Sequence, residues 1–278
     1  MAVSVARRLK QSLRPWIPPA AIRIVDQLKR GRSGLGKRLG SWSEAVAAST
    51  GYDHDQIFDR VDAQARAVSV AGSGVERDGV VLKEVQVPFP LVACLLRAAI
   101  KGGARRLHVI DFGGALGSSY HQCKLMLAPI AHLDWRIVEQ AGFVTRGRAF
   151  HVTESLTFHE TLEAAAVPNR PDVILFSSVL HYLPDPGEIL ARAVALEPRA
   201  IIIDRTPVSA LPSETFTIQY VPKDIYPARL PVRIFGVGQI DTLLAGYVRI
   251  VDFETVDPEM NVGSLLVKYR GALYESMN

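Results

Sequence analysis

A short glycine turn follows an apolar run near the middle of the chain. Residues 109–117 contain Asp111, Gly113, Gly114 and Gly117. Glycine lets the backbone adopt positive φ and approach a ligand closely, and the helix expected after this segment offers unpaired N–H groups at its N-terminus. The turn is therefore predicted to touch a ligand, although tight strand-to-helix turns also occur in α/β proteins that bind nothing there.

An acidic residue ends the next apolar run, residues 133–139. Glu139 lies 25 residues after Gly114. An acid at the tip of the second strand can accept hydrogen bonds from both hydroxyls of a ribose, as in dinucleotide-binding folds. Taken with the glycine turn, Glu139 indicates a cofactor that contains a nucleoside, whereas Glu139 alone would also fit an ordinary surface acid.

Polar residues also follow the apolar run 173–177. Ser177 and Ser178 come first, and His181 lies just beyond the expected strand end. A neutral imidazole there could take a proton from an acceptor hydroxyl, so His181 is the candidate base. The alternative is a histidine that only packs or bonds the backbone. Asp185 is predicted to cap the next helix.

Two further segments are expected on the same side of the molecule. Residues 204–206, Asp-Arg-Thr, end the next strand and could orient an acceptor, though an aspartate also commonly starts a loop. Residues 215–235 are predicted to be a long connection that covers the site as a lid. Its aromatic and basic members are Phe216, Tyr220, Tyr226, Arg229 and Arg233.

Short apolar runs alternating with amphipathic stretches would position these residues. The expected parallel strands are residues 107–112, 133–139, 156–159, 173–177 and 200–204. Two later runs, 248–252 and 263–269, are expected to close one edge as an antiparallel pair. This rhythm predicts a Rossmann-like α/β sheet covered on both faces, which binds ligands beyond the carboxyl ends of its strands.

The first hundred residues differ from this pattern. Residues 1–40 are predicted to form a basic arm that ends in a linker, and residues 41–104 a helical N-terminal subdomain. From Arg7 to Arg38 the arm holds ten basic residues and one acid, Asp26. Ile22, Val25 and Leu28 recur at helical spacing, which suits peripheral contact with an anionic membrane, although a solvated basic helix or tail is the simpler interpretation.

Composition narrows the class of protein. The 278 residues are 48% hydrophobic with a formal charge of +4, enough for one large core. No apolar run is long enough to span a bilayer, and prolines and charges interrupt the N-terminus where a signal peptide would need an apolar core. Cys94 and Cys123 form no CxxC pair, so neither zinc nor a disulfide framework is expected, and a cytoplasmic setting is predicted.

The glycine segment resembles the first motif of class I S-adenosylmethionine-dependent methyltransferases. Asp111, Gly113 and Gly117 match its acid and glycines, while Ala115 replaces the middle glycine. A pyrophosphate needs closer approach at that position than the amino-acid end of S-adenosylmethionine does, so Ala115 argues against NAD. The resemblance implies a seven-stranded methyltransferase sheet with an antiparallel last strand.

Six segments from Trp42 onward carry a wider resemblance: residues 42–52, 76–78, 111–119, 177–186, 204–207 and 263–266. They resemble a largely uncharacterised family of bacterial methyltransferases, often associated with surface-polysaccharide genes. It implies a sugar or other small-molecule glycan-precursor acceptor. The methyltransferase domain is predicted over residues 105–278, and the methylated atom is expected to be oxygen, with nitrogen as the alternative. The implied cofactor contacts are Asp111, Gly113, Gly114, Gly117, Glu139, Glu160, Ser177 and Ser178, with Glu160 near the adenine.

Three other functions remain open. The first is a non-catalytic scaffold that resembles a methyltransferase, which would bind the cofactor normally but transfer no methyl group. A nicotinamide-dependent oxidoreductase should show the complete three-glycine fingerprint and a hydride-site pair, and neither is evident in the sequence. Methylation of nucleic acid is not expected, because the body of the chain lacks a basic stripe with interleaved aromatics.

Overall fold

The computed structural model of the chain describes residues 34–50, 62–63, 75–77, 80–82, 86–221 and 228–277. The basic segment around Val25 and Leu28, with its predicted membrane contact, lies outside the described residues, as does Tyr226 of the predicted lid. Among the described helices, none is long and apolar enough to cross a membrane.

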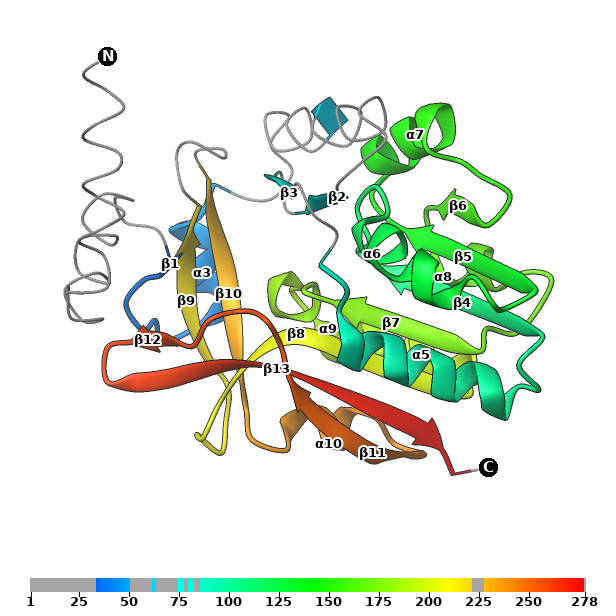
Figure 1. Cartoon of the computed structure of the whole chain (residues 1–278). Helices are drawn as coiled ribbons and strands as arrows, with labels where there is room; N and C mark the ends of the chain where they lie inside the picture. Colours follow the sequence, from blue (N-terminus) through cyan, green and yellow to red (C-terminus); the bar gives the residue numbers. More distant parts are fainter. Residues whose placement is uncertain are drawn as a thin grey trace, which may run out of the picture.

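A seven-stranded sheet of mixed direction forms the centre of the molecule (Figure 1), and its strand order is β6-β5-β4-β7-β8-β13-β11. The first five strands are parallel neighbours, whereas β13 runs antiparallel to both β8 and β11. This order, with an antiparallel last strand inside one edge, is the methyltransferase-type sheet that the sequence predicted.

The predicted parallel strands are confirmed, two of them without change and two within one residue at their ends. Their bounds are β4 Arg106–Phe112, β5 His132–Val138, β6 Leu156–His159, β7 Val173–Ser177 and β8 Ala200–Ser209. Strand β8 runs five residues past its predicted end. The antiparallel pair is also confirmed, as β11 Tyr247–Glu254 and β13 Leu265–Ser276.

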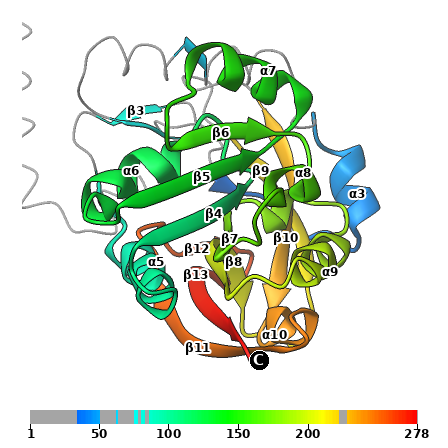
Figure 2. The same cartoon turned by 90° about the vertical axis from the view of Figure 1, so that its right-hand side faces the viewer.

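Helices cover both faces of this sheet (Figure 2). Helices α5 Phe89–Lys101, α6 Ser118–Leu127 and α7 Ala141–Phe150 pack on one face. Helices α8 Leu162–Ala166, α9 Pro186–Ala195 and α10 Gln239–Leu243 pack on the other. Because both faces are buried, the inner strands read as continuous apolar runs.

The seven central strands belong to an eleven-stranded hydrogen-bonded sheet, which continues along the ends of β8 and β13. We call this smaller continuation the second sheet. It adds β1 Gly34–Leu35, β9 Thr215–Tyr220, β10 Arg229–Gly236 and β12 Met260–Val262. Strand β10 pairs in parallel with the end of β8, and β12 pairs with the start of β13. The predicted lid over 215–235 is therefore wrong as a loop: most of it is paired strand.

The start of this sheet also corrects the predicted linker. Gly34 and Leu35 pair with β9, the Gly36 N–H donates to the Ile218 carbonyl at 2.7 Å, and Leu39 is buried. The part of the linker that the structure describes is thus held against the fold rather than spanning a gap.

The described parts of residues 41–104 are helix α3 Trp42–Ala47, a hairpin of β2 Val75–Arg77 and β3 Val80–Leu82, and α5. Helix α3 contacts β9 and β10, and the buried side of α5 belongs to the core of the central sheet. The extent of the predicted helical subdomain stays a prediction.

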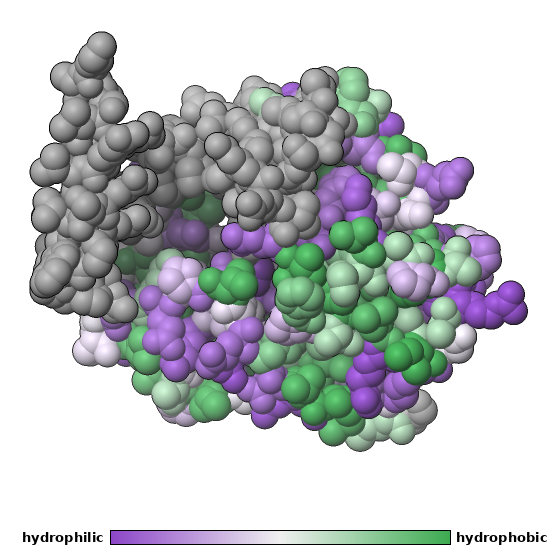
Figure 3. Space-filling model, viewed as in Figure 1, coloured by the Kyte–Doolittle hydropathy of each residue, from purple (hydrophilic) through white to green (hydrophobic). Residues whose placement is uncertain are grey.

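The face that carries α5 has hydrophobic and hydrophilic side chains interspersed (Figure 3). Phe89 and Ile100, at the two ends of α5, are exposed, while Cys94 in its middle is buried and free. Cys123 on α6 is likewise buried and free. Burial raises the pKa of the Cys94 thiol to about 11, so it stays protonated near neutral pH.

Candidate active site

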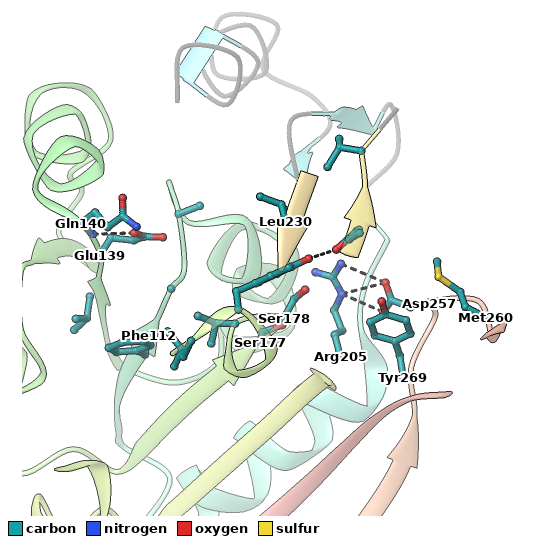
Figure 4. Close-up of a pocket in the computed structure, with 18 of the residues that line it drawn as sticks. Phe112, Glu139, Gln140, Ser177, Ser178, Arg205, Leu230, Asp257, Met260 and Tyr269 are labelled. Carbon is teal, nitrogen blue, oxygen red and sulfur yellow. Dashed lines mark hydrogen bonds and ion pairs between the residues drawn. The ribbon is translucent and has the colours of Figure 1, made fainter. Parts of the chain in front are cut away.

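A cavity of about 500 Å³ lies at the carboxyl ends of β4, β5, β7 and β8. The loops after these strands form one part of its wall, and β9, β10 and the segment before β12 form the other. Glu139 and Gln140 lie at one end, while Arg205, Asp257 and Tyr269 lie at the other (Figure 4). The cavity therefore has two ends of different chemistry, which we call the β5 end and the β12 end.

The glycine turn after β4 approaches the cavity with its backbone. Gly113 lines the cavity with φ 74°, and a Cβ added there would overlap the Val179 side chain. Ala115 also lines it, with φ 49°, a conformation that non-glycine residues rarely adopt. Gly117, with φ 99°, caps α6 without lining the cavity. The sequence prediction of a close backbone approach thus fits Gly113 best.

Asp111 lies beneath the turn rather than in the wall. Its carboxyl is buried, and a Cβ on Gly114 would meet it at 2.7 Å. Trp135 donates to Oδ2 at 3.1 Å, while Oδ1 has no hydrogen-bond partner among the described residues. Burial raises the pKa of Asp111 to about 7, and the Trp135 bond opposes that rise. An unpaired buried oxygen is costly in free energy, which points to a ligand donor or water above it.

Glu139 stands directly after β5 and lines the β5 end of the cavity. Its Oε2 accepts a hydrogen bond from the Gln140 N–H at 2.8 Å. Burial raises the pKa of Glu139 to about 7. A carboxyl in this position can hold the paired hydroxyls of a ribose, as the sequence predicted. Glu160, which follows β6, also lines this end.

Ser177 and Ser178 line the middle of the cavity where β7 ends. The Ser177 hydroxyl donates to Asp204 Oδ2 at 2.8 Å, and the Ser178 N–H donates to the Asp204 carbonyl at 3.0 Å. Ser178 has φ 57°. Asp204 is buried, so this residue of the predicted acceptor segment supports the end of β7 instead of facing the cavity.

His181 is fully buried and is not part of the cavity wall. Its ring centroid lies 4.0 Å from that of Tyr182 in the short helix η2 Leu180–Tyr182, and 6.3 Å from that of Tyr269. Tyr182 occupies the wall, and its hydroxyl donates to Gln219 Oε1. The role of His181 as a base stays a prediction, and the neighbouring Tyr182, rather than His181, lines the cavity.

The β12 end contains residues that the sequence did not identify. Gln219 and Val221 come from the β9 region, Leu230 from β10, and Asp257 and Met260 from the segment leading into β12. The lid residues Phe216 and Arg233 instead contact each other and Trp42, with the Arg233 guanidinium 5.2 Å from each ring centroid. The alternating apolar residues of β9 and β10 were the available signal, because these two strands follow each other in the sequence and pair with each other.

Among the described residues, no group of three or more His, Cys, Asp or Glu side chains is placed to hold a metal ion. The polar groups of the cavity suit an organic ligand with hydroxyl and amine functions at the β5 end and a second ligand at the β12 end.

No family model matches the chain, and no curated protein matches it. Its structure is similar to many class I S-adenosylmethionine-dependent methyltransferases at low sequence identity. One, from Clostridium acetobutylicum, is 8% identical with a TM-score of 0.44, over 67% of this chain and 91% of that one.

Two other solved structures widen the comparison. The 1,6-didemethyltoxoflavin-N1-methyltransferase of Burkholderia thailandensis, solved with 1,6-didemethyltoxoflavin and S-adenosylhomocysteine, is 15% identical with a TM-score of 0.43, over 86% of this chain and 92% of that one. A pericyclic reaction enzyme is 14% identical with a TM-score of 0.46, over 66% of this chain and 47% of that one.

Proposed function

We propose that this chain binds S-adenosylmethionine at the β5 end of the cavity and directs its methyl group to a small acceptor at the β12 end. The proposal rests on the positions of Glu139 and the Gly113 turn. Both line the cavity at the carboxyl ends of adjacent strands of a methyltransferase-type sheet. The orphaned Oδ1 of Asp111 beneath that turn fits a ligand that brings hydrogen-bond donors.

The residues of the chain would act mainly by orientation. Glu139 would hold the ribose, Glu160 would lie near the adenine, and Ser177 and Ser178 would border the reacting group. S-Adenosylmethionine supplies an already activated methyl group, so fixing the acceptor in line can contribute about 7 to 11 kcal/mol of barrier lowering. The acceptor would be a small molecule or glycan precursor that reacts through oxygen, and its proton would pass to solvent, because His181 is fully buried outside the cavity wall.

Calorimetry with S-adenosylmethionine, S-adenosylhomocysteine and NAD tests the cofactor. We expect saturable binding of the two adenosyl ligands and none of NAD. The variant Gly113→Ala should weaken adenosyl binding at least tenfold, because its Cβ meets Val179. Gly103→Ala is the matched control: Gly103 also has positive φ, 90°, but nothing lies within 4 Å of its added Cβ. Binding should be unchanged in this variant.

Three results would contradict the proposal or narrow it. NAD binding would favour an oxidoreductase, and the absence of adenosyl binding would remove the methyltransferase interpretation altogether. Normal adenosyl binding, with no S-adenosylhomocysteine formed from any of a broad set of hydroxyl and amine acceptors, would favour the scaffold. Circular dichroism of both glycine variants should accompany the titrations, since a misfolded protein would also fail to bind.

A further inference from the structure

Helix α5 is apolar on its outer surface as well as toward the core. Arg97 and Lys101 are the only charged side chains among its 13 residues, and the rest are apolar. Four apolar residues at helical spacing form an outward stripe: Phe89, Ala93, Leu96 and Ile100. Phe89 is 64% exposed and Ile100 is 69% exposed. A surface helix normally directs polar residues outward, and a helix that is apolar all round is covered on every side, so the stripe indicates a surface that a partner covers.

Helix α6 continues this apolar surface. It contacts α5 on the same face of the central sheet (Figure 2), and both helices end at the amino edge, where the adjacent strands β4 and β5 begin. Leu125, in the last turn of α6, is 74% exposed, and Met126 is exposed beside it. Ile100 and Leu125 therefore lie toward the same end of two neighbouring helices.

Strand β11 adds apolar residues on the other side of α5, and hydrophobic side chains lie over both elements in Figure 3. The exposed Val248 stands opposite Glu275 of β13, which bonds to α5. The exposed Val251 stands opposite Leu273, which belongs to the core beneath α5. Directly opposite residues share one face of a sheet, so both valines lie on the α5 side. We call the outward sides of α5, of the last turn of α6 and of this side of β11 the α5 face.

The charges near the α5 face are of one sign. Residues 86–131, which include both helices, contain five basic residues and one acid, Asp111, which is buried. On β11, Asp252 stands opposite Ala272 of the core cluster on the other side of the sheet, and Glu254 alternates with it. Both of these acids bind Arg270 there. The α5 face therefore has a positive rim.

A buried carboxylate fixes two of these cations beside the apolar stripe. Arg97 Nε donates to Glu275 Oε1 at 2.7 Å, and Lys101 Nζ donates to Oε2 at 2.9 Å. Glu275 is buried, whereas the side chains of Arg97 and Lys101 are about half exposed. One carboxylate cannot neutralise two cations, so a net positive charge remains where a partner could reach it.

Charge complementarity distinguishes between the partners that could cover this face. A two-fold contact with a second copy would bring the same patch of both copies together, so like charges would meet. The basic arm of the chain has ten basic residues and one acid from Arg7 to Arg38, so it would also be repelled. A membrane that contains anionic lipids offers an apolar interior to the stripe and negative headgroups to the cations.

We propose that the α5 face docks the protein on a membrane surface that contains anionic lipids. Phe89, Ile100 and Leu125 enter the boundary between headgroups and acyl chains. Arg97, Lys101 and Lys124 extend their charged ends to the lipid phosphates. The apolar residues and cations of the face do not line the cavity, so this inference does not depend on the proposed methyl transfer.

Co-sedimentation of the full chain with vesicles tests the docking surface. We would compare vesicles of phosphatidylcholine alone with an equal mixture of phosphatidylcholine and phosphatidylglycerol. The wild-type protein should bind the anionic vesicles at least tenfold more strongly, and less strongly at high salt. Ile100→Glu and Leu125→Glu should each lower that binding at least tenfold, because each replaces an inserted apolar side chain with an acid. Lys124→Gln should lower it about fivefold, the expected loss for one cation at an anionic surface.

Val237→Glu is the matched control. Val237 is 68% exposed, close to the value for Ile100, but it directly precedes the cap of α10, which packs on the opposite face of the sheet. Its substitution should leave vesicle binding unchanged. Circular dichroism and urea unfolding of the variants should match those of the wild type, so that a loss of binding reports the surface and not the fold.

Four results would overturn the proposal. They are no binding to the anionic vesicles, equal binding to both kinds of vesicle, an equal loss in Val237→Glu, and full binding by both Ile100→Glu and Leu125→Glu. The last result would place the membrane contact elsewhere, for example in the basic arm. Sedimentation velocity without vesicles adds a further test, since a wild-type dimer that Ile100→Glu dissociates would assign the α5 face to a second copy instead.

Discussion

At the scale of single residues, two carboxyl groups at one edge of the sheet share an unusual state. Burial raises the pKa values of both Asp111 and Glu139 to about 7, so each is partly protonated at neutral pH in the free protein. Glu139 lines the cavity and Asp111 lies beneath the turn. Perturbed pKa values of this kind gather at binding and catalytic sites, which supports the placement of the cofactor here.

Adenosyl binding should depend on the protonation of Glu139. Only the ionised carboxylate can accept hydrogen bonds from both ribose hydroxyls with its two oxygens, so the affinity for S-adenosylhomocysteine should fall as the pH decreases below about 7. Calorimetry between pH 5 and 8 measures the slope of log Kd against pH. In Glu139→Gln, binding should be weaker and the slope smaller by about one, the contribution of one proton. Equal slopes in the two proteins would show that Glu139 does not contact the ligand.

Residue types and spacing predicted the β5 end and the middle of the cavity, whereas at the β12 end they predicted Arg205 but missed Gln219 and Asp257. Gly113, Glu139, Glu160, Ser177 and Ser178 all lie in the wall. Each ends or directly follows a strand of the parallel sheet, and the carboxyl ends of parallel strands meet at one edge. Asp257 binds Arg205, which lies 52 positions away in the sequence, and no local sequence pattern predicts such a contact.

At the scale of elements, the strands of the parallel sheet were predictable because they are apolar on both faces. The end of β8 was not, because the charged pair Asp204 and Arg205 resembles the start of a loop. A β-bulge, in which Asp204 and Arg205 stand opposite Gly271 alone, accommodates both charges: one is buried against Ser177 and the other enters the cavity. The extended part of β8 pairs with β10. A prediction that ended this strand at residue 204 therefore could not include the second sheet.

The strain at the bulge should be measurable as an inverted order of two variants. In a regular strand, glycine is less stable than alanine by about 0.5 to 1 kcal/mol. At Arg205, where φ is 52°, alanine pays a left-handed backbone cost of about 1 kcal/mol or more that glycine avoids. Both variants lose the ion pair with Asp257, so that loss cancels. Arg205→Gly should therefore unfold at higher urea concentration than Arg205→Ala.

Val248 supplies the comparison for this prediction. It is an exposed residue of β11, outside the positive-φ positions, so Val248→Gly should be less stable than Val248→Ala. The same order at both positions would show that the bulge carries no strain.

At the scale of the whole molecule, the central sheet holds the main hydrophobic core, and the cavity lies between its carboxyl edge and the second sheet. The two hydrophobic core clusters on the faces of the central sheet contain none of the charged residues that line the cavity. The cavity, by contrast, gathers three non-glycine residues with positive φ, Ala115, Ser178 and Arg205, and lies above the buried Asp111. The features that cost stability are therefore concentrated where a ligand would bind, as expected when function opposes stability.

Asp111 should make the stability of the free protein depend on pH. Its ordinary pKa is 3.8 and its folded value is about 7, so between these values the folded state keeps a proton that the unfolded state releases. Stability should thus fall as the pH rises from about 4 to 7 and then level off. The full effect is roughly 4 kcal/mol, at 1.36 kcal/mol for each unit of pKa.

Asp111→Asn cannot ionise, and its amide oxygen can still accept from Trp135, so it should lose none of this stability. Urea unfolding of both proteins at pH 5 and pH 8, without ligand, compares them directly, and other titrating groups cancel in the difference. The variant should gain on the wild type as the pH rises. Parallel stability curves would mean that Asp111 is ionised in the folded protein at both pH values, with a partner for its charge already in place.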